Sequence, residues 1–252
     1  MRTISIINQK GGVAKTSTAS ALGSGLSRAG KKVILIDLDA QCNLSYIYKA
    51  VNKPITALEV LTHTATAQEA LLPIDGHSYI IPASQTLAGA DFMLTETGKE
   101  YRLREALQPL QEEADFCIID TPPSLGIVTV NALTASDSVI IPTSADVLPL
   151  QGIGALSQTI EAVKMYCNPN LSIEGILLTR YSNRTRLSRD IVQMVDDIAH
   201  NMSTKIFHTP IRECIAIREA QAMQQTIYEY APESNAVKDY EQLTMQILNI
   251  DI

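Results

Sequence analysis

Short runs of β-branched and other apolar residues recur along the chain, separated by longer segments in which apolar residues recur every three or four positions. The short runs predict strands that are buried on both faces, and the longer segments predict amphipathic helices. The predicted strands cover residues 4–7, 32–37, 79–82, 116–120, 138–142, 173–179 and 206–207. The predicted helices cover residues 16–29, 87–113 with a break near Gly98, 125–135, 150–166, 187–202, 215–223 and 235–248.

Two further helix starts have the spacing of a capping box, in which a threonine is followed three residues later by a glutamate: Thr56-x-x-Glu59 and Thr66-x-x-Glu69. The alternation of strand and helix predicts an α/β fold, a doubly wound, mostly parallel sheet flanked by helices. Ligands bind such a sheet at the carboxyl ends of its strands. No Pro/Gly/Ser-rich linker interrupts the 252 residues, so we expect residues 1–252 to form a single domain.

The segment between the first strand and the first helix has the composition of a phosphate-binding loop, Lys10-Gly11-Gly12-Val13-Ala14-Lys15-Thr16-Ser17. Glycines let backbone N–H groups turn inward, the helix that follows directs its positive dipole end at the same place, and a lysine adds a full charge. The standard pattern G-x-x-x-x-G-K-[ST] fails at both glycines, which are replaced by Gln9 and Ala14. The pattern alone therefore leaves open a phosphate cradle or an ordinary glycine-rich turn.

Three acids stand at or just beyond the ends of apolar strands, on the edge where the glycine loop also lies: Asp37, Asp39 and Asp120. Phosphoryl transfer to water needs a magnesium ion, a group that orients the attacking water, and cations that absorb developing charge. A single acid in this place is commonly a turn former or helix cap. Three of them together with two lysines favour a phosphoryl-transfer site.

The composition limits the possible partners. The formal net charge is −7, which argues against a protein coated in positive charge, so any DNA binding must come from a local patch. Four arginines fall within ten residues: Arg180, Arg184, Arg186 and Arg189. Arg212 and Arg218 join them if the fold brings them close. Such a patch can neutralise phosphates without reading bases, and the alternative is a solvated arginine-rich loop.

The sequence lacks a leader, a long apolar run and clustered cysteines or histidines, and these absences give expectations about location and metal content. It has no apolar N-terminal leader and no run of about 18 apolar residues, so we expect a cytosolic protein without a membrane anchor. Its four cysteines are far apart and its four histidines are scattered, which favours reduced thiols over a disulfide framework or a metal site.

The complete set of motifs resembles that of ParA-type DNA-partition ATPases. Residues 10–17 are similar to the deviant Walker A box, KGGxxK[ST][ST], of the ParA/MinD class of P-loop ATPases, in which a signature lysine precedes the glycines. LIDLDAQCN is similar to the D-x-D-x-Q-x-N segment of that family, and CIIDTPPSLG to its Walker B segment. Weaker matches follow in the family's order up to residue 243.

The resemblance implies a nucleotide site for ATP and Mg²⁺. Lys15 would hold the β- and γ-phosphates and Thr16 would ligate Mg²⁺. Ser17 would hold the α- and β-phosphates together with backbone groups of four neighbours: Gly11, Gly12, Val13 and Ala14. Arg180 and Pro210 would contact the adenine. Ala14 departs from the family's glycine, and if that position requires a positive φ, its methyl group costs about 1 kcal/mol and crowds the phosphates.

The resemblance also implies the catalytic groups. Lys10 would reach the nucleotide of a second subunit, so that ATP holds two subunits face to face. Asp39 would position the attacking water and, with Asp120, would contact Mg²⁺ through water. Asp37 would support this water-mediated coordination of Mg²⁺.

The function implied is ATP-dependent partition of a plasmid or chromosome by a cytoplasmic, nucleoid-associated protein. The ATP-bound homodimer would bind nonspecific DNA, and hydrolysis stimulated by a ParB-like centromere-binding protein would release it. The first strand begins at residue 3, which leaves no room for an N-terminal helix-turn-helix domain.

Three alternatives belong to other classes. A nucleotide-locked dimeric scaffold with little hydrolysis stays open because of Ala14. A MinD-like positioning ATPase would end in a basic amphipathic helix, whereas no Lys or Arg follows Lys238 here, so we expect the last helix to pack in the core. An iron–sulfur carrier of the same superclass would have paired cysteines, which the sequence lacks.

Overall fold

The computed structural model describes residues 1–144, 150–182 and 186–249. Its sheet contains seven strands: β1 (Arg2–Ile6), β2 (Val33–Asp37), β3 (Leu72–Pro73), β4 (Ser78–Ile81), β5 (Phe116–Asp120), β6 (Ser138–Ser144) and β7 (Ser172–Thr179). The strand order is β3-β4-β2-β5-β1-β6-β7. Every pairing is parallel except that of β3 with β4. The predicted doubly wound, mostly parallel sheet is confirmed.

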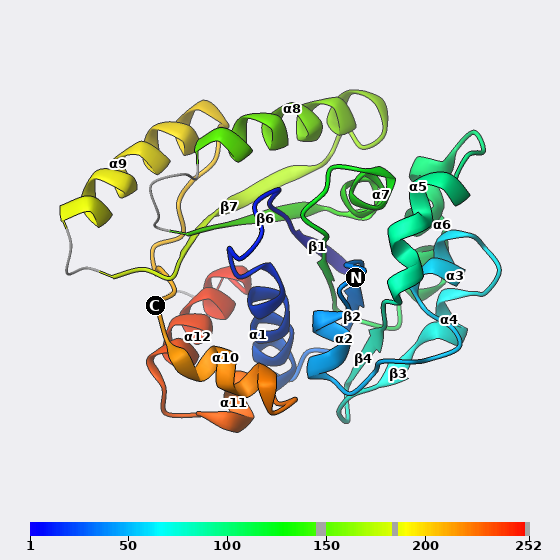
Figure 1. The fold of residues 1–252 in the computed structure, drawn as a ribbon, viewed down its shortest axis with the longest axis horizontal. Helices are drawn as coiled ribbons and strands as arrows, with labels where there is room; N and C mark the ends of the chain where they lie inside the picture. The colour runs from blue at the N-terminus through cyan, green and yellow to red at the C-terminus, as the bar shows by residue number, and fades with distance from the viewer. Residues whose placement is uncertain (145–149, 183–185, 250–252) are drawn as a thin grey trace.

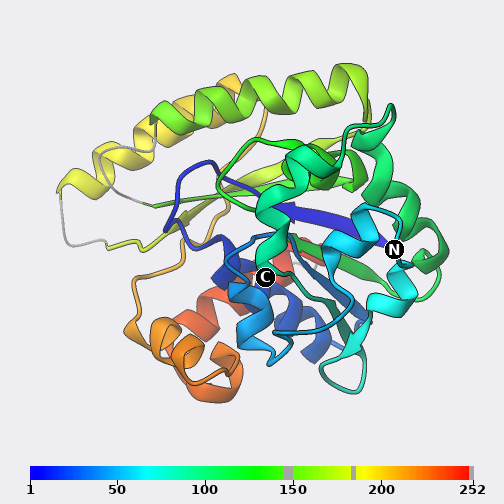
Figure 2. The same cartoon turned by 45° about the vertical axis from the view of Figure 1, so that its right-hand side comes forward.

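Helices lie in two layers, one on each face of the sheet (Figures 1 and 2). One layer holds α1 (Lys15–Arg28), α10 (Ile215–Ala222), α11 (Ile227–Tyr230) and α12 (Asn235–Ile247). The other holds α3 (Ala57–Leu61), α6 (Arg102–Leu107), α7 (Ile127–Ala135), α8 (Leu150–Tyr166) and α9 (Arg186–Asn201). Shorter segments are α2 (Asn43–Ile47), α4 (Ala67–Ala70), α5 (Ala90–Met93) and the 3₁₀ turns Gln85–Gly89, Lys99–Tyr101 and Gln108–Leu110.

Alternate residues of the central strands point to opposite faces, as the period of a strand requires. On β2, Leu35 packs in the cluster that contains α1 and α12, whereas Ile34 and Ile36 pack with α3 and α6. Because both faces are covered, all five β2 residues are buried. This explains why the central strands have continuous apolar sequences instead of alternating ones.

The last helix packs in the core, as expected. Val237, Tyr240 and Leu243 of α12 lie in the same apolar cluster as Leu22 and Leu26 of α1. The Tyr240 hydroxyl also shares a hydrogen bond of 3.3 Å with Thr18. Helix α12 therefore supports the helix that follows the glycine loop. In the described residues, the structure contains no helix that is long and apolar enough to cross a membrane.

Several element boundaries differ from the prediction. Both predicted capping boxes form, at Thr56 and Thr66. The predicted helix 87–113 is divided into short α and 3₁₀ segments, with Gly98 at a φ of 85°. The predicted strand at 206–207 is reduced to a single bridge between Ile206 and Ile176. The pattern did not predict α2, α11 or β3.

Candidate functional site

The glycine loop joins the end of the central strand β1 to the start of α1. Its shape depends on Asn8, whose side-chain oxygen accepts the Lys10 N–H at 2.9 Å and whose amide donates to the Pro142 carbonyl at 2.8 Å. The Thr179 hydroxyl donates to the Val13 carbonyl at 3.2 Å. The loop is thus attached to the neighbouring strands β6 and β7, and its shape does not depend on α1 alone.

Two residues of the loop adopt the left-handed backbone conformation, Gly12 with a φ of 76° and Ala14 with a φ of 67°. Ala14 occupies the position directly before α1, where the standard pattern has glycine. An L-residue in this conformation costs about 1–2 kcal/mol because its Cβ approaches the following carbonyl oxygen. Ala14 therefore has the positive φ at which its methyl group was expected to be unfavourable.

Lys15 is nearly buried, with 7% of its surface exposed. Its ammonium donates to the Lys10 carbonyl at 3.3 Å. Burial lowers the pKa of Lys15, and the charges of Asp120 and Asp39 oppose this shift. The lysine therefore interacts electrostatically with both carboxylates.

Asp37 and Asp120 end the adjacent strands β2 and β5 and face each other in the register of the sheet. The Asp37 carboxylate accepts the Ser45 N–H at 2.8 Å and the Ser45 hydroxyl at 2.7 Å, and also the Asp39 N–H at 3.1 Å. Burial raises the pKa of Asp37 to about 6, although these hydrogen bonds lower it. Asp37 therefore fixes the turn that carries Asp39.

Asp120 has no such partners. It is fully buried, and neither carboxylate oxygen accepts a hydrogen bond from a described residue. Thr16 is close enough to lower the pKa of Asp120 but does not complete a hydrogen bond, whereas burial and the charge of Asp37 raise this pKa well above its usual value. A buried carboxylate without donors is costly unless a cation compensates it. Together with the Thr16 hydroxyl, this unpaired carboxylate is an oxygen donor set of the kind that Mg²⁺ prefers.

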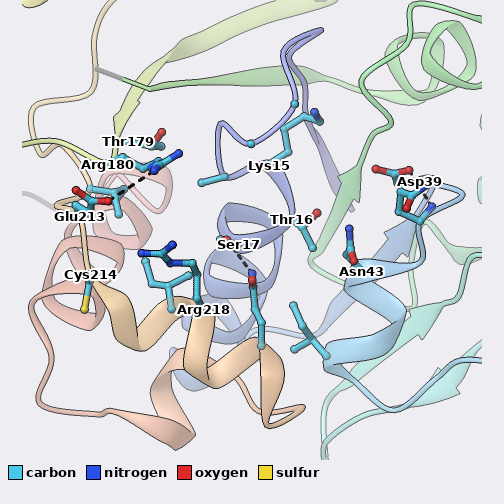
Figure 3. Close-up of a pocket in the computed structure, with 18 of the residues that line it drawn as sticks. Lys15, Thr16, Ser17, Asp39, Asn43, Thr179, Arg180, Glu213, Cys214 and Arg218 are labelled. Atoms are coloured by element: carbon cyan, nitrogen blue, oxygen red, sulfur yellow. Dashed lines mark hydrogen bonds and ion pairs between the residues drawn. The ribbon is translucent and has the colours of Figure 1, made fainter. Parts of the chain in front are cut away.

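A cavity of about 660 Å³ opens beside the loop. Figure 3 shows Lys15, Thr16 and Ser17 on one side, Asp39 and Asn43 on a second, and Arg180, Glu213 and Arg218 on a third. The phosphate-loop residues and Asp39 are therefore brought together, as predicted. Lys10, Val13, Asp37 and Asp120 do not line the cavity, but hydrogen bonds, strand register or charge connect each of them to residues that do.

The two residues predicted to contact adenine lie apart. Arg180 lines the main cavity, where one Nη atom lies 3.6 Å from a Glu213 carboxylate oxygen. Pro210 instead lines a neighbouring cavity of about 650 Å³, which shares Arg212 and Glu213 with the first. Both adenine contacts stay predictions.

The six arginines predicted to contact DNA have different environments. Arg184 and the side chains of Arg186 and Arg189 lie outside the described residues. Arg180 and Arg218 are exposed at the main cavity. Arg212 binds Asp239 through Nε at 2.9 Å and Nη2 at 2.6 Å, and its N–H donates to the same carboxylate at 2.9 Å.

Four supporting residues were not predicted from the sequence: Asn8, Ser45, Thr179 and Gln221. Each hydrogen-bonds a loop residue or acid named above, and most of the bonds span long sequence distances. Asn8 alone had a local signal, because an Asn two residues before a turn can accept a backbone N–H.

Comparison with known proteins agrees with this geometry. The family described as "AAA domain" matches residues 1–173. The chain is 35% identical over 254 residues to the chromosome partitioning protein ParA of Myxococcus xanthus, covering 99% of this chain and 89% of the relative. It is 36% identical over 251 residues to the sporulation initiation inhibitor protein Soj of Bacillus subtilis, covering 98% of each.

A solved structure agrees as well. A cobyrinic acid a,c-diamide synthase from Mycobacterium smegmatis, with bound ATP analog and magnesium, has a TM-score of 0.87 and 34% identity to this chain. The match covers 99% of this chain and 95% of that one.

The fold and the site together define a P-loop ATPase. The defining features are the doubly wound sheet, the glycine loop with its lysine after the central strand, and the acids at the ends of the adjacent strands. The matches over nearly the whole chain to the chromosome partitioning protein ParA and to Soj narrow this class. The chain belongs to the ParA/Soj family of chromosome-partitioning ATPases.

The left-handed conformation of Ala14 predicts how Ala14→Gly affects stability. Glycine removes a backbone strain of about 1–2 kcal/mol and loses about 0.5–1 kcal/mol through the entropy of the unfolded chain. We expect the free energy of unfolding in urea to stay equal or to rise by up to about 1 kcal/mol.

The matched control is Ala21→Gly, at a buried position inside α1. It should lower the free energy of unfolding by about 1–2 kcal/mol through lost helix propensity and a lost methyl contact. An equal loss for both variants would show that Ala14 carries no strain.

The Arg212–Asp239 pair predicts a structural effect of Arg212→Met. Asp239 is 5% exposed at its side chain, so losing its partner leaves a buried carboxylate with too few donors. Because 46% of the Arg212 side chain is exposed, we expect a loss of about 1–2 kcal/mol in unfolding free energy. Arg218→Met, at an exposed arginine, should change it little. Unchanged stability together with weaker DNA binding would favour the DNA role for Arg212.

Proposed function

We propose that this protein is an ATP-dependent DNA-partition ATPase, in which ATP binding drives a dimer, the dimer binds DNA without sequence preference, and hydrolysis releases it. The observation that supports the proposal is the presence of the glycine loop, Lys15 and Asp39 around one cavity, with the buried carboxylate of Asp120 close enough to act on the charge of Lys15. Membership of the ParA/Soj family supports the partition role.

The substrate is ATP with Mg²⁺. Backbone N–H groups of residues 11–14 and the start of α1 attract the phosphates, and Lys15 adds a charge from a desolvated position. Thr16 and, through water, Asp39 and Asp120 would hold Mg²⁺, which supplies charge neutralisation between the β- and γ-phosphates when bound. The related structure with a bound ATP analog and magnesium supports both ligands.

Hydrolysis depends on Asp39. Its backbone is held by Asp37, and its own carboxylate accepts the Gln41 N–H at 3.0 Å. The carboxylate is half-buried and lines the cavity, so it can accept a hydrogen bond from a water beside the terminal phosphate. We therefore assign the positioning of this water to Asp39 and the stabilisation of the developing charge to Lys15.

The dimer depends on Lys10. The tip of the loop is open to solvent at Gly11 and Gly12, and Lys10 is half-buried beside them. A second copy of the chain approaching this edge would place its Lys10 at the nucleotide of the first. ATP would then act as the contact between the two subunits, and loss of the γ-phosphate would weaken it.

The dimer would hold DNA through arginines on the side of β7, α9 and α10, and a ParB-like protein would stimulate hydrolysis and release. We further infer that residues 1–252 act as one ATPase domain in the cytoplasm, at the nucleoid. Phosphate contacts would dominate the binding, because the net charge of −7 leaves only a local patch for DNA.

Two variants test the proposed cycle. Lys15→Ala should abolish ATP-dependent dimerisation, because the buried charge at the phosphates is lost. Asp39→Ala should bind ATP and dimerise but lose phosphate release by about 100-fold or more, because the attacking water is no longer positioned. Sedimentation velocity with ATP and a phosphate-release assay measure the two properties.

Normal dimerisation of Lys15→Ala would refute the loop assignment, and unchanged turnover of Asp39→Ala would remove its role. The left-handed alanine at position 14 supports one alternative, a dimer locked by ATP with little hydrolysis. Phosphate release at background level from the unmodified protein, with DNA and partner present, would favour that alternative.

A further inference from the structure

Helix α10 contacts the phosphate loop through a single polar bond. The Gln221 side-chain amide donates to the Ser17 hydroxyl oxygen at 2.9 Å, across 204 residues of sequence. Figure 3 shows this bond as the dashed line at Ser17. Both Ser17 and Gln221 line the main cavity.

The direction of this bond determines where the Ser17 proton can point. A serine hydroxyl has one proton to donate and two lone pairs to accept with. Gln221 uses an accepting lone pair through its N–H, so the Ser17 proton stays available for another acceptor. A carboxylate or carbonyl in place of this amide would instead take the proton.

The usual competitor for that proton is also occupied. In the first turns of a helix, a serine hydroxyl commonly donates to the carbonyl four residues earlier, which for Ser17 is that of Val13. Here the Thr179 hydroxyl donates to the Val13 carbonyl at 3.2 Å. The Val13 carbonyl keeps a second lone pair, but it already has one donor, and a charged phosphate oxygen in the cavity is the stronger acceptor for the Ser17 proton.

Gln221 is held firmly enough to impose this direction. Its neighbour Ala220 is fully buried in the apolar cluster that also contains Leu22 of α1 and Tyr240 of α12. Two backbone N–H groups, of Met223 and Gln225, bond to the Ala220 carbonyl at 3.1 and 3.0 Å and close the end of α10. The position of Gln221 relative to α1 is thus set by packing on both sides of the bond.

We propose that Gln221 is a positioning residue for nucleotide binding, which directs the Ser17 hydroxyl proton into the cavity as a donor to a phosphate oxygen of ADP or ATP. This inference rests on the proposed function, because it requires the nucleotide to occupy the cavity. The phosphate concerned is one that ADP and ATP share, because the resemblance to the family assigns Ser17 to the α- and β-phosphates.

The experiment measures ADP affinity by titration calorimetry for the full chain and for Gln221→Met, which keeps the length of the side chain but removes its donor. We expect ADP to bind about threefold to tenfold more weakly, the range for one oriented hydrogen bond. A non-hydrolysable ATP analogue should lose the same factor. In steady-state hydrolysis, KM for ATP should rise while kcat stays the same, because this bond supports ground-state binding.

The matched control is Gln225→Met, because Gln225 lies just beyond the same helix and its side chain does not bond to Ser17 in the described structure. It should bind ADP as the unmodified protein does. Gln221→Glu should weaken ADP binding more than Gln221→Met does, because a carboxylate accepts the Ser17 proton and also repels the phosphates.

A double-mutant cycle with Ser17→Ala separates positioning from a general effect on the fold. Once the hydroxyl is absent, Gln221→Met should cause no further loss of ADP affinity. An equal further loss in the Ser17→Ala background, or unchanged affinity of Gln221→Met alone, would overturn this inference and leave the proposed function intact. Failure of the unmodified protein to bind ADP would overturn both.

Discussion

The rest of the site depends on charges buried at the carboxyl edge of the sheet. Asp37 and Asp120 face each other at the ends of adjacent strands, and the buried Lys15 interacts with the charges of Asp120 and Asp39. Ser45 compensates Asp37, but no described donor compensates Asp120. An uncompensated buried carboxylate costs stability. A cation bound beside Asp120 would compensate this charge.

The cavity wall opposite the loop is fixed by bonds between distant segments. Arg212 holds the segment before α10 to Asp239 on α12, and Tyr240 and Gln221 connect α12 and α10 to the first turns of α1. The three connections hold α10 and α12 beside α1, on the same face of the sheet (Figure 1). The C-terminal segment, which matched the family only weakly by sequence, therefore completes the site.

The sequence predicted those elements whose formation depends on neighbouring residues. The strands were found because continuous apolar runs are needed where both faces are covered, and the boxes at Thr56 and Thr66 because a cap needs only residues three apart. The helix predicted over 87–113 was wrong in detail, since Asn131 holds Leu103 and Lys99 from a distant helix and imposes short segments. Gln221 could not be predicted as part of the site, because nothing near it in sequence indicates Ser17.

We propose that ATP, through this site, creates a DNA-binding form of the protein. Co-sedimentation with long nonspecific DNA, in Mg²⁺ with ATP, with ADP or without nucleotide, tests it most directly. We expect the protein to sediment with the DNA in the presence of ATP, but not with ADP or without nucleotide. The fraction bound to DNA should decrease steeply as the salt concentration rises. Equal retention under all three nucleotide conditions, or none with ATP at low salt, would contradict it.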